Sequence, residues 1–196
     1  MHININYHNA ITNNKFIEKA RDDVFFPETK PSANYKIWIS MLGPTTCFDC
    51  ADNHERIIAL NDPTTVKPPL HLRCKCSLEE IEAIKSGSAT HNKTDGADYW
   101  LKHYGKLPEY YISPEQLGEL GWKKNEHPSQ YISGKMLGGG IYENYNRKLP
   151  VKPGRVWYEA DLNYTPGRRN LLRIVWSSDG LIFVTYDHYH TFYEIV

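Results

Sequence analysis

The sequence predicts an α+β fold, in which short helices precede an antiparallel β-sheet in the C-terminal half of the chain. The first observation is an amphipathic segment, 98–104, followed by Gly105, the residue type that often ends a helix. The second is residues 113–116, Ser-Pro-Glu-Gln, whose order is typical of a helix N-terminus. The third is a change to strand-like alternation after Gly154. Helices followed by strands are typical of this fold class.

The strand region contains a clear hairpin signal. In residues 171–176 an apolar set alternates with a second set that includes Arg173, which predicts a strand with one buried face. Residues 178–180, Ser-Asp-Gly, follow, and Asp-Gly between two such runs is typical of a tight turn. We therefore expect a second strand at 181–186 that pairs with the first.

Four side chains in this half have the types that RNA cleavage requires: Glu159, Arg169, Arg173 and His188. When RNA is cleaved by its own 2′-hydroxyl, a base takes the hydroxyl proton and an acid protonates the departing 5′-oxygen. Fixed cations stabilise the charge that develops on the phosphate oxygens. Each residue type is common on exposed strands, so the interpretation depends on the motifs around them.

These residues lie in a series of motifs that runs from Ala97 to the C-terminus. The motifs are, in order, K-L-P-E-Y-Y-I, L-G-W, G-K-M-L-G-G-G-I-Y, K-L-P, E-A-D-L-N-Y-T, R-I-V-W-S-S-D and D-H-Y-H-T-F. With them, segment 91–196 resembles the barnase-like bacterial ribonucleases. The resemblance implies a fold in which short helices pack on an antiparallel sheet, and it implies endoribonuclease activity.

The resemblance also implies a role for each matched position. Glu159 matches the general base of the family and His188 its general acid, while Arg169 and Arg173 match the arginines that hold the scissile phosphate. Tyr189 matches a tyrosine that lines the same site. The implied reaction is transphosphorylation to a 2′,3′-cyclic phosphate, followed by slower hydrolysis, and it requires no metal or other cofactor.

The sequence departs from the family pattern at three positions. Pro114 stands where the family has a site lysine, and Gly140 stands where it has the aspartate beside that lysine. In the loop that recognises guanine, Asn146 replaces a base-reading glutamate. An amide can accept a hydrogen bond from guanine and can equally serve another base, so the base preference stays open.

Further contacts to RNA are expected around these positions. Arg168 adjoins Arg169 and is predicted to compensate in part for the missing lysine; a solvated loop position is the alternative. The predicted substrate contacts are Tyr189, Tyr142, Asn144, Asn146 and Arg168. Tyr145 is a further candidate to stack on a base. The formal net charge of zero excludes a basic protein that coats nucleic acid non-specifically. We therefore expect RNA to bind a local basic cluster, formed by Lys152, Arg155, Arg168, Arg169 and Arg173.

All four cysteines lie before residue 90, as Cys47-x-x-Cys50 and Cys74-x-Cys76, and His71 lies three residues before the second pair. Two pairs of thiolates brought together by turns suit a tetrahedral zinc ion. The four cysteines are the predicted ligands, with His71 as a replacement for one of them. Two disulfides, or reduced thiols without a metal, are the alternatives.

The cysteine segment, 47–76, has a resemblance of its own. Two stretches, C-F-D-C-A-D-N-H-E-R (47–56) and P-P-L-H-L-R-C-K-C (68–76), are similar to the cysteine motif of phage head-morphogenesis (Mu F-like) proteins, and a proline-rich turn at 63–69 lies between the two cysteine pairs. Leu72 stands where that motif has a proline. The resemblance implies a role in attachment or delivery. Residues 52–60 between the two pairs have a helical pattern.

The small polar residues 86–95 predict a linker, and therefore two domains. We expect a small Cys-rich, zinc-stapled module at 1–90 and a barnase-like endoribonuclease domain at 91–196. Within the first, residues 12–23 predict a helix and residues 35–41 a strand.

The combined interpretation is an endoribonuclease toxin. No apolar run approaches the roughly 20 residues that span a bilayer, and the first residues lack the basic start and apolar core of a signal peptide. Because a folded ribonuclease would damage the cell that makes it, we expect a delivered effector of the polymorphic-toxin kind that acts in the target-cell cytoplasm. An inhibitor, for which the resemblance implies a barstar-like protein, would protect the producer. The alternatives are a catalytically weakened binding or phage-head-associated protein, and a DNase on the same fold.

Overall fold

The computed structural model describes residues 27–124, 126–163 and 169–196 of the chain. Its elements are β1 (Thr29–Ile39), α3 (Phe48–Asp52), β2 (Ile57–Ala59), β3 (Ser77–Ile84), η1 (Lys93–Asp95), α4 (Ala97–Tyr104), β4 (Tyr111–Ile112), α5 (Pro114–Glu119), η2 (Pro128–Gln130), β5 (Met136–Ile141), β6 (Trp157–Asp161), β7 (Arg173–Ser177), β8 (Ile182–Thr185) and β9 (Tyr193–Ile195). The strands described form one sheet in the order β2-β1-β3-β9-β8-β7-β6-β5-β4. The mixed α+β class is confirmed. The helix predicted at 12–23 lies outside the described residues.

Both helices predicted in the C-terminal half are confirmed. Helix α4 ends at Gly105, whose φ of 66° is left-handed and suits glycine. Helix α5 begins after Ser113, whose hydroxyl accepts from Gln116 N at 3.2 Å, while the Gln116 side chain accepts from Ser113 N at 3.1 Å. This reciprocal pair is the capping box that the sequence predicts. Local signals were sufficient here because both ends are determined by neighbouring residues.

The predicted hairpin is confirmed as β7 and β8, which pair antiparallel with Trp176 opposite Ile182. Gly180 occupies the turn at a φ of 93°, a conformation that residues with a side chain rarely adopt. Strand β7 is buried on both faces, however, where one buried face was predicted: Ile174 and Val175 are both fully buried. The second face is covered by residues from the N-terminal segment, a name used here for residues 27–90.

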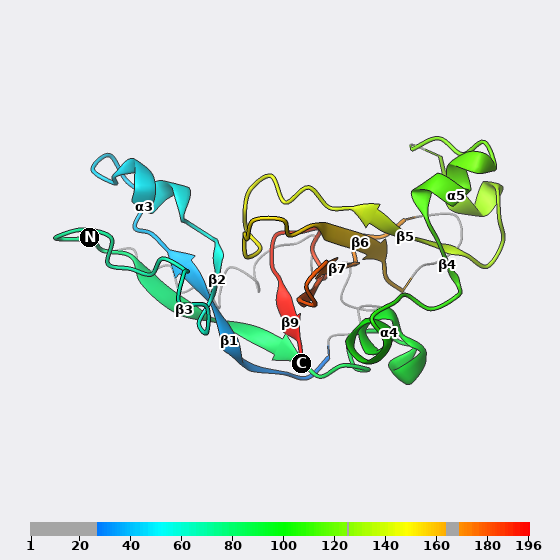
Figure 1. Cartoon of the computed structure of the whole chain (residues 1–196), viewed down its shortest axis with the longest axis horizontal. Coiled ribbons are helices and arrows are strands. Elements are labelled where there is room, and N and C mark those ends of the chain that lie inside the picture. Colours follow the sequence, from blue (N-terminus) through cyan, green and yellow to red (C-terminus); the bar gives the residue numbers. More distant parts are fainter. Residues whose placement is uncertain (1–26, 125, 164–168) are drawn as a thin grey trace, which may run out of the picture.

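Two core clusters lie on the two faces of the sheet. The first packs Ile174 and Val184 against helix α4 through Leu101. The second packs Val175 and Phe183 together with residues of β1, β2 and β3, namely Tyr35, Ile57 and Ile81. Figure 1 shows β1, β2, β3 and α3 on one side of β9 and the two helices α4 and α5 on the other. The N-terminal segment is therefore a structural part of the nuclease core.

The predicted linker at 86–95 is wrong. Ser86 N donates to Val196 O at 2.8 Å, which continues the parallel pairing of β3 with β9. Gly87 N and Ala89 N then donate to the buried carboxylate of Asp98, at 2.7 and 2.9 Å. Because one buried anion holds these backbone groups, the small polar residues form an ordered connection. The domain boundary near residue 90 stays a prediction, but the described residues on its two sides share one sheet.

The helix predicted at 52–60 is also wrong. Helix α3 ends at Asp52, and Glu55 has a left-handed φ of 62°. Residues 57–59 instead form β2, which pairs with β1 across Tyr35 to Ile37. The β-branched Ile57 and Ile58 are buried there, so packing in the sheet overrides the local helical pattern. The strand predicted at 35–41 lies largely within β1.

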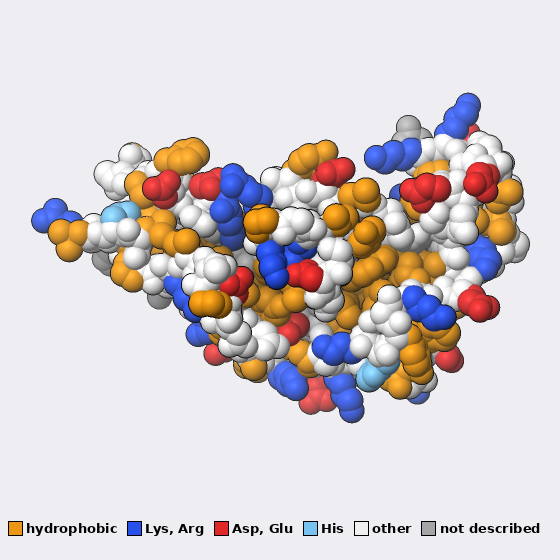
Figure 2. All heavy atoms as spheres, in the orientation of Figure 1, with side chains coloured by type: hydrophobic (Ala, Val, Ile, Leu, Met, Phe, Trp, Pro, Cys, Tyr) orange, Lys and Arg blue, Asp and Glu red, His pale blue; other side chains and the backbone are white. Residues whose placement is uncertain are grey.

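The surface has no single charge sign. Figure 2 shows basic and acidic side chains interspersed over the visible face, as the net charge of zero leads one to expect. Among the described helices, none is long and apolar enough to cross a membrane.

Candidate active site

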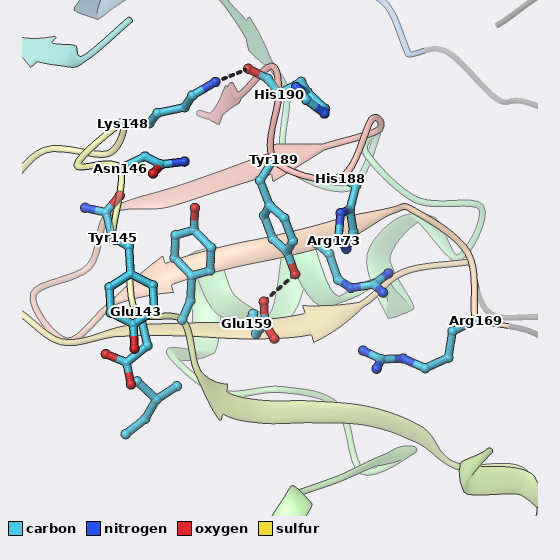
Figure 3. Close-up of a pocket in the computed structure, with 13 residues that line it drawn as sticks. Glu143, Tyr145, Asn146, Lys148, Glu159, Arg169, Arg173, His188, Tyr189 and His190 are labelled. Atoms are coloured by element: carbon cyan, nitrogen blue, oxygen red, sulfur yellow. Dashed lines mark hydrogen bonds between the residues drawn. The ribbon is translucent and has the colours of Figure 1, made fainter. Parts of the chain in front are cut away.

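A pocket of about 530 Å³ opens above strands β6 and β7 (Figure 3). It contains all four residues predicted to perform the chemistry. The lining residues are Ile141, Tyr142, Glu143, Asn144, Tyr145, Asn146, Lys148, Glu159, Arg169, Arg173, His188, Tyr189 and His190. The structure therefore brings together a carboxylate, two guanidiniums and an imidazole from positions spread over the last forty residues.

Glu159 lies in the middle of β6, opposite Val175 of β7 and Gly140 of β5. The hydroxyl of Tyr189 donates a hydrogen bond to Glu159 Oε2. Burial, with the nearby negative charge of Glu159, raises the pKa of Tyr189 well above its usual value. The tyrosine therefore stays protonated and acts as a fixed donor that orients the carboxylate.

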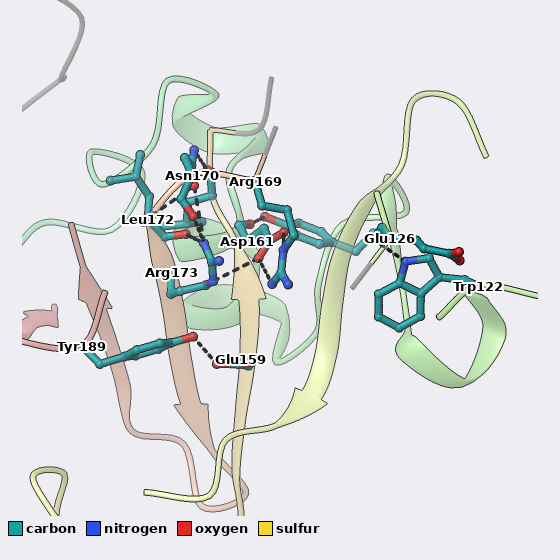
Figure 4. Close-up of polar contacts among 11 residues, drawn as sticks. Trp122, Glu126, Glu159, Asp161, Arg169, Asn170, Leu172, Arg173 and Tyr189 are labelled. Atoms are coloured by element: carbon teal, nitrogen blue, oxygen red, sulfur yellow. Dashed lines mark hydrogen bonds and ion pairs between the residues drawn. The ribbon is translucent and has the colours of Figure 1, made fainter. Parts of the chain in front are cut away.

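Asp161 organises the two arginines and was missed in the sequence (Figure 4). Arg169 donates to its two oxygens from Nε and Nη2, each at 2.8 Å. This bidentate contact, with the negative charge of Asp161, raises the pKa of Arg169. Alternation along a strand puts residues 159 and 161 on one face, and this spacing could have identified Asp161.

Arg173 is almost fully buried, with a side chain 5% exposed. Its Nη1 donates to the carbonyls of Asn170 and Leu172, both at 2.7 Å. Its Nε lies 3.1 Å from Asp161 Oδ1, an ion pair in which the N–H is not aligned as a hydrogen bond. A buried cation held at fixed carbonyls is preorganised to meet an anion in the pocket.

His188 lies in the loop after β8, in a left-handed conformation with φ of 57°, and Tyr189 follows at 70°. Thr185, which is fully buried, holds this unusual pair of residues: its Oγ1 accepts from Tyr189 N at 3.0 Å and donates to Asp187 at 2.9 Å. Burial lowers the pKa of His188 below its usual value, and the positive charge of Arg173 lowers it further. Such strain beside a reactive side chain is common at functional sites.

The rewritten loop, 142–146, forms one wall of the pocket. Tyr142 stacks on Tyr189, with ring centroids 5.0 Å apart and planes inclined by 24°, whereas Tyr145 is 84% exposed. Asn144 lines the pocket, but both ends of its amide bind the backbone of Leu149. Its side chain therefore shapes the loop, and the predicted base contact of Asn146 stays a prediction. Arg168 lies outside the described residues.

The two replaced family positions are neighbours in space. A Cβ atom added to Gly140 would lie 3.2 Å from Cγ of Pro114. Gly140 is also the residue opposite Glu159 across β5 and β6. The two predicted departures from the family pattern, a missing cation and a missing anion, thus lie next to each other, and together they would leave the net charge of this part of the pocket unchanged.

The predicted basic cluster is wrong in part. Arg155 binds Asp179 through two hydrogen bonds of 2.8 Å, and Lys152 Nζ lies 3.8 Å from the same carboxylate. Neither basic residue lines the pocket, because the turn after β7 holds both. Two other basic residues, Lys148 and His190, do line it and were not predicted.

The four cysteines and His71 also lie together, at helix α3. Cys50 Sγ is 3.6 Å from Cys74 Sγ, and His71 Nε2 is 3.3 Å from Cys50 Sγ and 3.2 Å from Cys47 Sγ. Cys76 groups with Cys50 and Cys74 within 4.8 Å. The five donors thus form two overlapping groups that share Cys50. Soft thiolates with one imidazole suit zinc.

The four thiols are unbonded in this structure. All four cysteines are free, and 3.6 Å is far longer than a sulfur–sulfur bond of about 2.05 Å. Backbone hydrogen bonds at Cys76 and Leu70 lower the pKa of Cys74 to about 6, whereas burial raises the pKa of Cys50, which belongs to both groups. The ligand set and the choice between zinc and disulfides stay predictions.

Comparison with known proteins identifies an RNA-cleaving endoribonuclease. A ribonuclease family model matches residues 87–196, more than half of the chain. The chain therefore belongs to this family. The ribonuclease of Heyndrickxia coagulans is 43% identical over 105 residues, which cover 53% of this chain and 96% of that protein. The ribonucleases of Bacillus intermedius and Bacillus pumilus are 43% identical over 105 residues, or 65% of each protein.

Proposed function

We propose that the chain cleaves RNA by metal-independent transphosphorylation, with Glu159 as general base and His188 as general acid. The observation that carries the proposal is the convergence of these two residues with Arg169 and Arg173 in one pocket. A base, an acid and two fixed cations are the groups that this reaction needs, because the 2′-hydroxyl of RNA is the nucleophile.

In the first step, Glu159 takes the proton of the 2′-hydroxyl. Tyr189 occupies Oε2, so the acceptor in this proposal is Oε1. The 2′-oxygen then bonds to phosphorus, the bond from phosphorus to the 5′-oxygen breaks, and His188 protonates the departing oxygen. Arg169 and Arg173 stabilise the charge on the non-bridging oxygens. In the second step the roles reverse: His188 deprotonates water, the water oxygen bonds to phosphorus, and the bond from phosphorus to the 2′-oxygen breaks as Glu159 returns a proton to that oxygen.

The full chain tests this proposal directly. Glu159→Gln and His188→Ala should each lower cleavage of a diribonucleotide by at least about 100-fold, the usual contribution of a general base or acid. A 2′-deoxy substrate should resist cleavage, which separates the reaction from that of a DNase. Activity that survives in the double variant would place the chemistry elsewhere, and an inert wild-type chain would favour the catalytically weakened binding protein.

We propose further that the protein is a delivered toxin with a dedicated inhibitor. An inhibitor that fills this pocket would present carboxylates to Arg169, Arg173 and His188, because the site is built to hold an anion. The altered 142–146 loop would require a partner adapted to it, barstar-like or different. Association should then be fast at low ionic strength and slow as salt is added. Association rates that ignore salt would count against such an inhibitor. The Mu F-like resemblance and a structural zinc belong to the same proposal, as the attachment part of the toxin.

A further inference from the structure

The loop 142–149 is closed by hydrogen bonds between its own residues. Asn144, at a φ of 45°, donates through Nδ2 to Leu149 O at 3.0 Å and accepts at Oδ1 from Leu149 N at 3.1 Å. Arg147 N donates to Asn144 O at 2.8 Å. A group that holds Arg147 and Lys148 therefore also holds the pocket-lining residues that precede them.

Three polar contacts join residues 52–57 to this loop. Asp52 Oδ1 forms an ion pair with Arg147 Nη2 at 3.0 Å, and Glu55 Oε2 forms one with Lys148 Nζ at 3.0 Å. The backbone N–H of Ile57 donates to Lys148 O at 2.6 Å. These contacts join the part of the chain that carries the cysteines to the part that faces the substrate.

Helix α3 connects the two acids to the cysteine cluster. Cys47 caps the helix, Cys50 lies within it and Asp52 is its last residue. Cys50 Sγ lies 3.3 Å from His71 Nε2 and 3.6 Å from Cys74 Sγ, on a different loop. A zinc ion bound by four of the five donors would tie helix α3 to that loop and so fix the position of Asp52.

We propose that the N-terminal segment is a positioning element of the RNA site. Asp52 and Glu55 hold the substrate loop through Arg147 and Lys148, and zinc at the cysteine cluster holds helix α3 in the required place. This inference rests on the RNA-cleaving function proposed above. It assigns the two acids to substrate binding, so their loss raises KM and leaves kcat nearly unchanged.

The sign of the effect separates positioning from electrostatics. Neutralising an acid near an anionic ligand would strengthen binding if charge alone mattered. If Asp52 and Glu55 hold the loop, Asp52→Asn and Glu55→Gln weaken binding although each removes a negative charge. The Asp52 and Glu55 side chains are 29% and 38% exposed, so each pair is weak and a Kd increase of about fivefold is expected.

The experiment measures the Kd of the zinc-loaded full chain for a 2′-deoxy oligonucleotide, which cannot be cleaved. Asp49→Asn is the matched control, because Asp49 is an exposed acid in the first turn of the same helix. We expect Asp52→Asn, Glu55→Gln and the zinc-free wild type to bind about fivefold more weakly, and Asp49→Asn to bind as the wild type or more tightly.

The possible results lead to different conclusions. Equal Kd values for Asp49→Asn, Asp52→Asn and Glu55→Gln would overturn the positioning role. Weaker binding in the two acid variants, with no response to zinc, would remove the metal from the proposal. A wild-type chain that binds the analogue and cleaves no RNA would refute the proposed cleavage, while the Kd comparison would still decide this inference.

Discussion

The buried carboxylate of Asp161 accepts two hydrogen bonds from the guanidinium of Arg169, each at 2.8 Å. The same carboxylate lies 3.1 Å from Nε of Arg173, so one anion orients both cations that we propose to hold the phosphate. Asp161 is 2% exposed and lies two residues after Glu159 on the same strand. Its effect on the reaction would therefore be indirect, through the position of the arginines.

Asp161→Asn is expected to lower kcat/KM by roughly 100-fold, the usual loss when one preorganised charge contact is removed from such a site. It should also destabilise the fold by roughly 3 kcal/mol, because Arg173 would be left buried without its counter-charge. Steady-state kinetics and thermal unfolding measure the two effects. Asp179→Asn is the control, since it breaks a similar bidentate pair with Arg155 away from the pocket. A faster Asp161→Asn enzyme would show that added positive charge matters more than orientation.

The rate of RNA cleavage should begin to fall at an unusually low pH as the pH is raised. A general acid must be protonated, and burial together with Arg173 lowers the pKa of His188 below its usual value of 6.5. For the free enzyme, the basic limb of kcat/KM should therefore lie below pH 6.5. The basic limb of kcat should lie higher, because a bound phosphate stabilises the protonated ring. Profiles of both parameters for a diribonucleotide test this, and a kcat/KM limb above pH 7 would contradict it.

Prediction from the sequence succeeded where the signal was local. The capping box at Ser113 and the turn at Gly180 each depend on residues a few positions apart, and both were found as expected. The pairing of β3 with β9 joins Ala83 to Glu194, and no pattern within either strand encodes a partner so far along the chain. Family motifs led us to expect Glu159, Arg169, Arg173 and His188 in one site, and all four line one pocket, although their roles stay predictions. The use of the Asn144 amide within its own loop depends on a backbone fold that the sequence does not reveal.

The effects of introducing a cation at position 114 and an anion at position 140 should be cooperative. Pro114→Lys returns a cation next to the strand position opposite Glu159, and should raise kcat/KM by about tenfold, or 1.4 kcal/mol of barrier. Gly140→Asp alone should lower it, because it adds a negative charge and its Cβ would lie 3.2 Å from Cγ of Pro114. In the double variant the proline ring is gone and the new charges can pair, so the aspartate should cost less than it does alone. Additive effects would mean that the two positions do not interact.

Zinc binding should stabilise the whole described fold, including the nuclease half. If the Cys-rich module and the nuclease domain folded independently, stripping the metal would unfold residues 41–80 and leave the nuclease intact. The shared sheet contradicts that separation, because β1 and β2 contribute Tyr35 and Ile57 to the core cluster that also contains Val175 and Phe183.

Elemental analysis with free-thiol counting under denaturing conditions should therefore give one zinc ion and four titratable thiols per chain. Removal of the zinc should lower the temperature of a single unfolding transition, because metal that binds only the folded state stabilises everything that unfolds with it. Two separate transitions, with only the lower one sensitive to zinc, would mean that the two parts unfold independently. Absence of both metal and free thiols would mean that the cysteines form two disulfides. Two variants test which residue is the fourth ligand. His71 Nε2 lies 3.2 Å from Cys47 Sγ and 3.3 Å from Cys50 Sγ. Loss of zinc in His71→Ala but not in Cys76→Ser would identify His71 as the fourth ligand, beside Cys47, Cys50 and Cys74.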